Sequence, residues 1–157
     1  TRGQLGYLFH HLATHPEHRR RLLDDPALIP GAVEECLRVY SIILGDGRKV
    51  TTDIDFHGVP MKKGDMVWLS VAAANRDPRA FDDADQFVLD RKGNTHFGFA
   101  AGPHRCLGAH LARGEMAIAV EEWHRRIPDY RLATDQPLFE RGGMLSAFSL
   151  PLSWEVS

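Results

Sequence analysis

The sequence predicts an α+β fold that is mainly helical and carries small β-sheets. Three observations support this prediction. Apolar residues recur at helical spacing in several segments, apolar and polar residues alternate in one stretch, and glycine- and proline-rich turns separate these segments. We find no internal repeat and no low-complexity linker.

The first 40 residues predict three helices. Residues 4–13 place leucine and phenylalanine side chains at helical spacing. The stretch Thr14-His15-Pro16-Glu17 fits a capping box with proline in the first turn, which predicts a second helix to about Leu23. A third helix is expected over 32–40, with its apolar residues buried.

The middle of the chain predicts strands followed by irregular structure. Residues 50–56 alternate between apolar and polar types, which indicates one strand, and a turn at 62–65 leads to a second strand over 66–71. Residues 75–105 are expected to be irregular and to be anchored in the core by Phe81, Phe87 and Phe97.

A long helix and a hairpin are expected at the end of the chain. After Cys106, apolar residues at helical spacing run to Pro128, and Leu111 and Ile118 widen the apolar face. This pattern predicts a central, largely buried helix. The remainder, with Gly142-Gly143, predicts a β-hairpin.

Composition narrows the class of protein. The chain has 157 residues and a formal net charge of −2, so a strongly basic nucleic-acid-binding surface is not expected. No apolar run approaches the roughly 20 residues of a membrane span. Two cysteines do not make a disulfide framework, which favours a reducing cytoplasm. The composition is that of an ordinary soluble globular protein.

The most informative segment is the loop that ends at Cys106. Residues 99–108 read Phe-Ala-Ala-Gly-Pro-His-Arg-Cys-Leu-Gly, and the predicted long helix follows directly. Backbone N–H groups at a helix start favour a thiolate. Such a thiolate is a nucleophile or a metal ligand, and the remaining alternative is a buried structural thiol.

Neither common use of a reactive thiol has its expected partners. A phosphatase-type loop would carry a basic residue about one turn into the helix, but position 112 is alanine and Arg113 falls one place late. A cysteine hydrolase would use His104, which lies in the same short loop. Zinc is poorly supported, because Cys36 is distant and no C-x-x-C pair exists.

The spacing Phe-x-x-Gly-x-His-x-Cys-x-Gly resembles the haem-binding loop of the cytochrome P450 family. The resemblance covers nearly the whole chain, but only the C-terminal portion of that fold. It implies haem b as cofactor and a cysteine thiolate as the axial iron ligand. It implies that Cys106 is the ligand, that Phe99 packs beside the sulfur, and that the N–H groups of Leu107, Gly108 and Ala109 donate to it.

The same resemblance implies contacts to the haem propionates. His104 would bond one propionate. The stretch Asp46-Gly47-Arg48 is similar to the corresponding segment of the bacterial camphor hydroxylases of this family, so Arg48 and Asp46 would lie at a propionate. Ala100 departs from the pattern, because the family usually has glycine there.

A structural network is also implied. Glu35 and Arg38 lie three residues apart on one predicted helix, a spacing that by itself is typical of an exposed surface pair. The resemblance implies instead a buried network with Arg91, which holds the loop that carries Cys106.

The implied activity is that of a haem-thiolate monooxygenase. One oxygen atom of O2 would enter a small apolar, terpenoid-like substrate lined by Ile43, Leu44, Met144 and Leu145. An iron–sulfur ferredoxin would supply electrons, and Arg105, Arg113, Arg125 and Arg126 would form a basic surface for it or a solvated helix face.

Residues 1–157 are then expected to be the haem-ligating part of one larger monooxygenase domain. The distal acid–alcohol pair and the N-terminal part are not represented, so this chain alone is expected to be inactive. Two alternatives stay open: a cysteine-ligated haem sensor without turnover, and a cysteine-nucleophile hydrolase. The histidines at 10, 11, 15 and 18 are expected at the surface.

Overall fold

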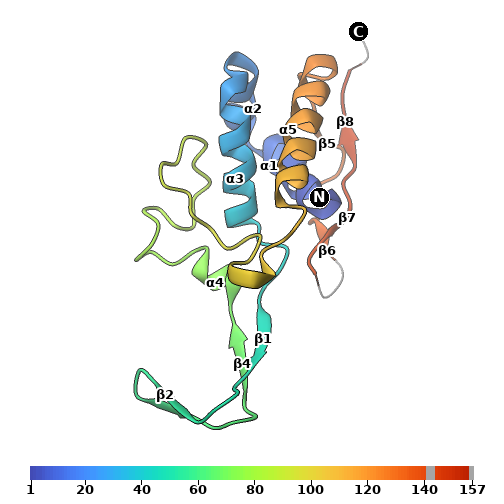
Figure 1. Cartoon of the computed structure of the whole chain (residues 1–157). Coiled ribbons are helices and arrows are strands. Elements are labelled where there is room, and N and C mark those ends of the chain that lie inside the picture. Colours follow the sequence, from blue (N-terminus) through green and yellow to red (C-terminus); the bar gives the residue numbers. More distant parts are fainter. Residues whose placement is uncertain (141–143, 156–157) are drawn as a thin grey trace.

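A computed structural model describes residues 1–140 and 144–155. Helices dominate it, and four two-stranded antiparallel sheets complete it. Figure 1 shows α3 and α5 side by side, with α1 behind them and a long β arm extending away from their ends. The α+β class with small sheets is confirmed.

The helices of the first 40 residues are α1 (Arg2–Thr14), α2 (Pro16–Asp24), the 3-10 turn η1 (Pro26–Leu28) and α3 (Ile29–Val39). The capping box is wrong: the Thr14 hydroxyl donates to the His10 carbonyl at 2.9 Å, and no side chain caps α2. Helix α3 begins earlier than expected, because Pro30 in its first turn needs no N–H partner.

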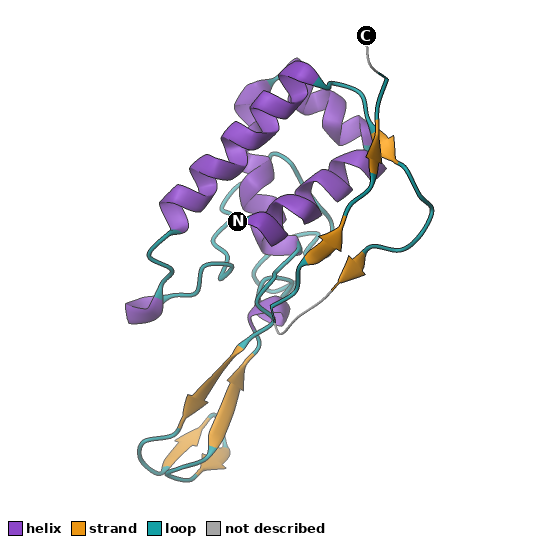
Figure 2. Cartoon of the chain, turned by 90° about the vertical axis from the view of Figure 1, so that its right-hand side faces the viewer, coloured by secondary structure: helices purple, strands orange, loops and turns teal. Residues whose placement is uncertain are grey.

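The arm, residues 46–69, contains β1 (Asp46–Lys49), β2 (Ile54–Phe56), β3 (Val59–Met61) and β4 (Met66–Leu69). Strand β1 pairs with β4, and β2 pairs with β3 (Figure 2). The expected strand over 50–56 is therefore wrong in its first half. The alternation there has no buried face, because every residue of β2 is exposed.

The chain returns to the helices through α4 (Val71–Ala74), a long irregular segment and the 3-10 turn η2 (Gly102–His104). Phe81 and Phe87 are buried there as expected, but Phe97 is 45% exposed. Phe97 instead lies in the wall of the cavity described below.

Helix α5 (Ala109–Arg126) follows, and then the short strands β5 (Arg131–Leu132), β6 (Phe139–Glu140), β7 (Ala147–Ser149) and β8 (Leu152–Ser153). Strand β5 pairs with β8 and β6 pairs with β7, so a hairpin is present. Its expected turn, Gly142-Gly143, lies outside the described residues. The expected burial of α5 is wrong for Leu111 and Ile118, which are 67% and 60% exposed on a face that no described element covers.

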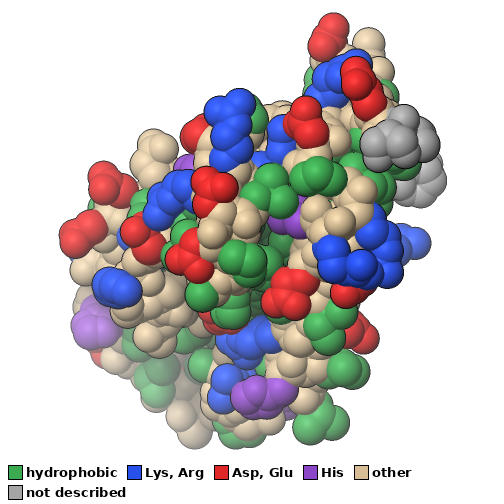
Figure 3. Space-filling model, turned by 90° about the horizontal axis from the view of Figure 1, so that it is seen from above, with side chains coloured by type: hydrophobic (Ala, Val, Ile, Leu, Met, Phe, Trp, Pro, Cys, Tyr) green, Lys and Arg blue, Asp and Glu red, His purple; other side chains and the backbone are tan. Residues whose placement is uncertain are grey.

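One apolar core joins α1, α3 and α5. It buries aliphatic side chains from all three helices, among them Leu8, Leu37 and Met116. Outside it, the face seen in Figure 3 carries acidic and basic side chains interspersed with apolar ones rather than a patch of one sign. No helix in the described part of the chain has the length and apolarity needed to cross a membrane.

The four histidines do not all lie at the surface. His11 is only 2% exposed, stacks on Phe87 with 3.9 Å between ring centroids, and shares hydrogen bonds of 2.8 Å with Tyr40 and His18. Burial, with His15, His18 and His10 nearby, lowers the pKa of His11 to about 3. The expectation of a surface histidine is therefore wrong for His11, whose ring instead fills the junction of α1, α2 and α3.

Candidate functional site

A cavity of about 990 Å³ lies where the Cys106 loop, the base of the arm and the ends of α3 and α5 meet. Its walls combine the start of α1 and the first turns of α5 with residues drawn from three segments, which lie within 42–48 (Leu44 excepted), 69–74 and 97–108. Eight of the residues predicted for the site line it: Ile43, Asp46, Arg48, Phe99, His104, Cys106, Gly108 and Met144. The topology thus brings segments 100 residues apart into one hollow.

The loop is shaped by backbone hydrogen bonds. The Cys106 N–H donates to the Phe99 carbonyl oxygen at 2.9 Å, which closes the loop on itself. Gly102 has a φ of +67°, a left-handed conformation that glycine adopts without steric cost. Ala100 has a φ of +57°, so an ordinary side chain occupies a strained position. The Cys106 side chain is exposed to the cavity and has no histidine partner among the described residues.

The amides after Cys106 are placed differently from one another. Leu107 is fully exposed, and Gly108 is the N-cap of α5. The Ala109 N–H donates to the Cys106 carbonyl oxygen at 3.3 Å and so closes the turn that starts α5. Donation to the sulfur by Leu107, Gly108 and Ala109 stays a prediction.

A polar rim, defined as Asp46, Arg48 and His104, borders the cavity. Asp46 and Arg48 are two apart on β1, so their side chains lie on one face of the strand. Arg48 donates to the Asp46 carboxylate and, at 2.9 Å, to the Gly47 carbonyl. This hydrogen bond, with the charges of Arg48 and of His104, holds the pKa of Asp46 below its usual value. The rim therefore collects one acid and two basic groups at the mouth of the hollow.

The Glu35 network, defined as Glu35, Arg38 and Arg91, is buried. Arg38 makes two bonds to the Glu35 carboxylate, at 2.9 and 2.7 Å, and both side chains are 0% exposed. Arg91 donates to the same carboxylate at 3.0 Å. Although burial works to raise it, these bonds keep the pKa of Glu35 below its usual value.

The network also fastens the irregular segment. Arg38 donates to the carbonyl oxygens of Asn75 and Gln86 at 2.8 Å, and the Asn75 side chain accepts the Phe97 N–H at 2.7 Å. The two arginines are thus bonded to backbone that leads directly into the Cys106 loop. The reading of Glu35 and Arg38 as an exposed surface pair is wrong.

A second cluster was missed in the sequence. The Glu34 cluster, defined as Glu34, His96 and Arg113, lies beside the loop, and Arg113 binds the Glu34 carboxylate through two nitrogens. Arg113 is therefore not free to join a basic surface. The neighbouring position of Glu34 and Glu35 was the available signal, but nothing in the sequence says which partners each acid takes.

Only two of the four predicted substrate residues line the cavity. Ile43 and Met144 line the cavity, whereas Leu44 and Leu145 do not. Leu145 packs against the core, and its N–H donates to the Ile42 carbonyl oxygen at 2.8 Å. No cluster of residues with metal-binding geometry occurs within residues 1–140 and 144–155.

Comparisons with known proteins agree with this geometry. The family model described as cytochrome P450 matches residues 27–125. A probable cytochrome P450 127A1 of Sinorhizobium fredii is 40% identical over 96% of this chain and 36% of its own length. The mycinamicin IV hydroxylase/epoxidase of Micromonospora griseorubida is 41% identical over 98% of this chain and 40% of its own length.

Solved structures give the same result. A MycG F286A mutant bound to mycinamicin IV superposes with a TM-score of 0.90 at 41% identity, covering 97% of this chain and 40% of that one. P450BioI in complex with an acyl carrier protein gives 0.91 at 37% identity, covering 98% and 40%. This chain spans about two fifths of the length of these relatives. It belongs to the cytochrome P450 family.

Proposed function

We propose that residues 1–157 form the C-terminal, haem-ligating part of a single larger domain of a haem-thiolate monooxygenase. The observation that carries this proposal is the placement of Cys106 in the wall of a large hollow whose rim bears Arg48 and His104. Members of the family bind haem b, so the question is whether these residues suit it.

The donor set fits that group. A thiolate is a soft ligand that suits haem iron and raises electron density on it. The hollow is lined largely by apolar residues, which suits a flat porphyrin, and the basic side chains of the rim, Arg48 and His104, suit the acidic propionates. Cys106 would hold the iron, and Arg48 and His104 would hold the propionates. When bound, the haem supplies the activation of O2 for insertion of one oxygen atom into an unactivated C–H bond.

The chain's own residues orient and tune that site. The Leu107, Gly108 and Ala109 N–H groups would donate to the sulfur, and Phe99 would pack beside it. The Glu35 network would keep the Cys106 loop in place through its bonds to the segment that precedes the loop. No residue of this chain is assigned to proton delivery, so turnover is proposed for the full-length protein only.

The substrate is proposed to be a small apolar molecule of terpenoid type. Ile43 and Met144 are apolar side chains that line the hollow and are 37% and 63% exposed. The relatives are named for several kinds of substrate, including a mycinamicin and a steroid. Camphor-like chemistry therefore rests only on the resemblance of Asp46-Gly47-Arg48 and of the stretches 56–59 and 62–65.

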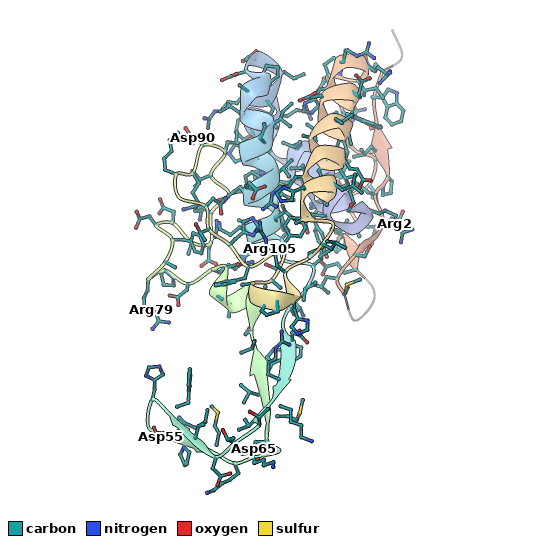
Figure 4. All side chains as sticks on the ribbon, viewed as in Figure 1. Arg2, Asp55, Asp65, Arg79, Asp90 and Arg105 are labelled. Atoms are coloured by element: carbon teal, nitrogen blue, oxygen red, sulfur yellow. The ribbon has the colours of Figure 1, made fainter. Side chains whose placement is uncertain are left out.

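The electron donor is proposed to be an iron–sulfur ferredoxin. Of the four arginines considered, Arg125 and Arg126 bind Glu122, and Arg113 belongs to the Glu34 cluster. Arg105 is exposed on the Cys106 loop, below the ends of the helices in Figure 4. Its charge is therefore the best placed of the four to attract an acidic partner.

The decisive experiment is the absorption spectrum of the reduced, carbon monoxide-bound full-length protein and of its Cys106→Ser variant. We expect the band of a thiolate-ligated haem in the first and its loss in the second. A wild-type protein without that band would contradict the proposal. O2-dependent product formation distinguishes a monooxygenase from a haem sensor, and rapid alkylation of Cys106 in the holo protein would favour a hydrolase.

A further inference from the structure

The Glu34 cluster lies between two helices and the Cys106 loop. Arg113, on α5, donates to Glu34 of α3 through Nε and through Nη2, the latter at 2.9 Å. His96 reaches the same carboxylate at 3.1 Å, and its side chain is only 2% exposed. A single carboxylate therefore ties α3, α5 and the segment before the loop together.

The hydrogen-bond roles of the His96 ring follow from its contacts. Its Nδ1 accepts the Gly98 N–H at 3.0 Å, so Nε2 is the nitrogen that donates to the Glu34 carboxylate. A side chain at Gly98 would meet the Leu37 carbonyl oxygen at 2.8 Å, so the backbone passes directly against α3. Although burial works to raise it, the bonds from His96 and Arg113 lower the pKa of Glu34 to about 2. The carboxylate is thus a fixed negative charge.

The cluster meets the site at Phe99. The Arg113 guanidinium lies over the Phe99 ring, 4.7 Å from its centroid. The Phe99 carbonyl accepts the Cys106 N–H at 2.9 Å, so the residue that carries the ring also anchors the cysteine. Holding the guanidinium by two bonds to Glu34 leaves it one orientation above the ring.

We propose that Arg113, held by Glu34 and His96, is a positioning residue that clamps Phe99 and thereby keeps Cys106 in place to ligate haem iron as a thiolate. This inference rests on the proposed function. It also gives Arg113 a role other than partner docking.

The chain offers a matched control for a test. Arg19 also lies over an aromatic ring, 4.8 Å from the Tyr130 centroid, and pairs with a carboxylate, that of Asp129, although its side chain is more buried than that of Arg113. It packs at the other end of α5, away from the Cys106 loop, so Arg19→Gln removes the same kinds of interaction without touching the site.

The experiment compares Arg113→Gln, Arg113→Lys, Glu34→Gln and Arg19→Gln in the full-length holoenzyme. The readout is the fraction of the reduced carbon monoxide complex in the thiol-ligated rather than the thiolate-ligated form, with thermal unfolding recorded in parallel. We expect Arg113→Gln to raise that fraction about fivefold. Glu34→Gln should raise it less, Arg113→Lys should not restore the wild-type value, and Arg19→Gln should lower only the melting temperature.

Three outcomes would overturn the inference. If Arg113→Gln and Arg19→Gln change only the melting temperature, the role of Arg113 is merely structural. If Arg113→Lys behaves as wild type, charge alone acts and no clamp exists. A wild-type protein that shows no thiolate-ligated complex overturns the proposed function and this inference together, and that result is read before any variant is compared. If Arg113→Gln does not fold, Arg113→Lys and Glu34→Gln still decide the question.

Discussion

The Glu35 network and the polar rim use similar side chains in opposite surroundings. In the network, a carboxylate and two guanidinium groups are buried and have partners within the chain. In the rim, Asp46 and Arg48 are about half exposed and border a hollow. The network can be explained by its contribution to folding alone, whereas the exposed ion pair of the rim contributes little to the stability of the fold. This difference separates residues that build the site from residues that would touch its ligand.

The largest effect is expected in the network. Glu35→Gln leaves two buried guanidinium groups without their counter-ion, which costs about 3–5 kcal/mol of the free energy of unfolding. Urea denaturation of the full-length protein measures this. Glu122→Gln, which removes a surface acid paired with two arginines, is the control and should cost far less, because water screens an exposed ion pair. Equal losses in the two variants would erase the contrast between network and surface.

Lowering the pH should reduce the free energy of unfolding through buried polar groups, above all His11, more than through the rim. The pKa of His11 is lowered to about 3 in the fold from its ordinary value of 6.5, so the unfolded chain binds the proton first. The stabilising effect of a neutral His11 is complete above about pH 6.5 and is lost as the pH falls towards 3, by up to about 1.4 kcal/mol per pH unit.

Stability measured between pH 7 and 4 tests this effect of His11. His11→Gln should flatten the dependence, because glutamine takes up no proton. An unchanged slope in that variant would assign the acid sensitivity to other groups.

The rim should affect ligand binding rather than stability. Arg48→Gln is expected to weaken haem binding about tenfold, because a charge-assisted bond to a propionate is worth about 1.5–3 kcal/mol. Haem titration of the apo protein checks this. Lys49→Gln is the control, since alternate residues of a strand point to opposite faces. Similar losses of haem affinity in both variants would show that the rim acts only through general surface charge.

The smallest effect is expected in the loop. Ala100 occupies a left-handed conformation, φ +57°, that costs an ordinary residue about 1–2 kcal/mol relative to glycine. Ala100→Gly should therefore raise the melting temperature of the holo protein by a few degrees. A fall in melting temperature would show that the methyl group packs favourably enough to outweigh the backbone strain.

The sequence predicted best what depends on local pattern. Helices α1, α3 and α5 follow from apolar spacing, and the loop with Cys106 follows from glycine, proline and a helix start. The arm was less predictable, since Val50 bonds to Asp65 and Gly64 just beyond the end of β1 and is not part of a strand. Leu111 and Ile118 were expected inside because apolar spacing shows which face is apolar, not what covers it.

The partners of buried polar residues were least predictable. Glu34 and Glu35 are neighbours, yet one binds Arg113 and His96 and the other binds Arg38 and Arg91. Such a choice depends on the direction in which each side chain leaves α3 and on loops that arrive from 50 or more residues away. His11 shows the same limit, because its burial depends on the distant Phe87 and Tyr40 as well as on the nearby His15 and His18.

The hydrogen bond from the Leu145 amide to the Ile42 carbonyl has a practical consequence for redesign. It joins two walls of the hollow whose tips carry Met144 and Ile43, so a shift of one backbone is transmitted to the other. A substitution made at either position alone to change substrate selectivity would therefore also shift the other position. Libraries that vary positions 43 and 144 jointly should therefore reach pocket shapes that sequential single substitutions miss.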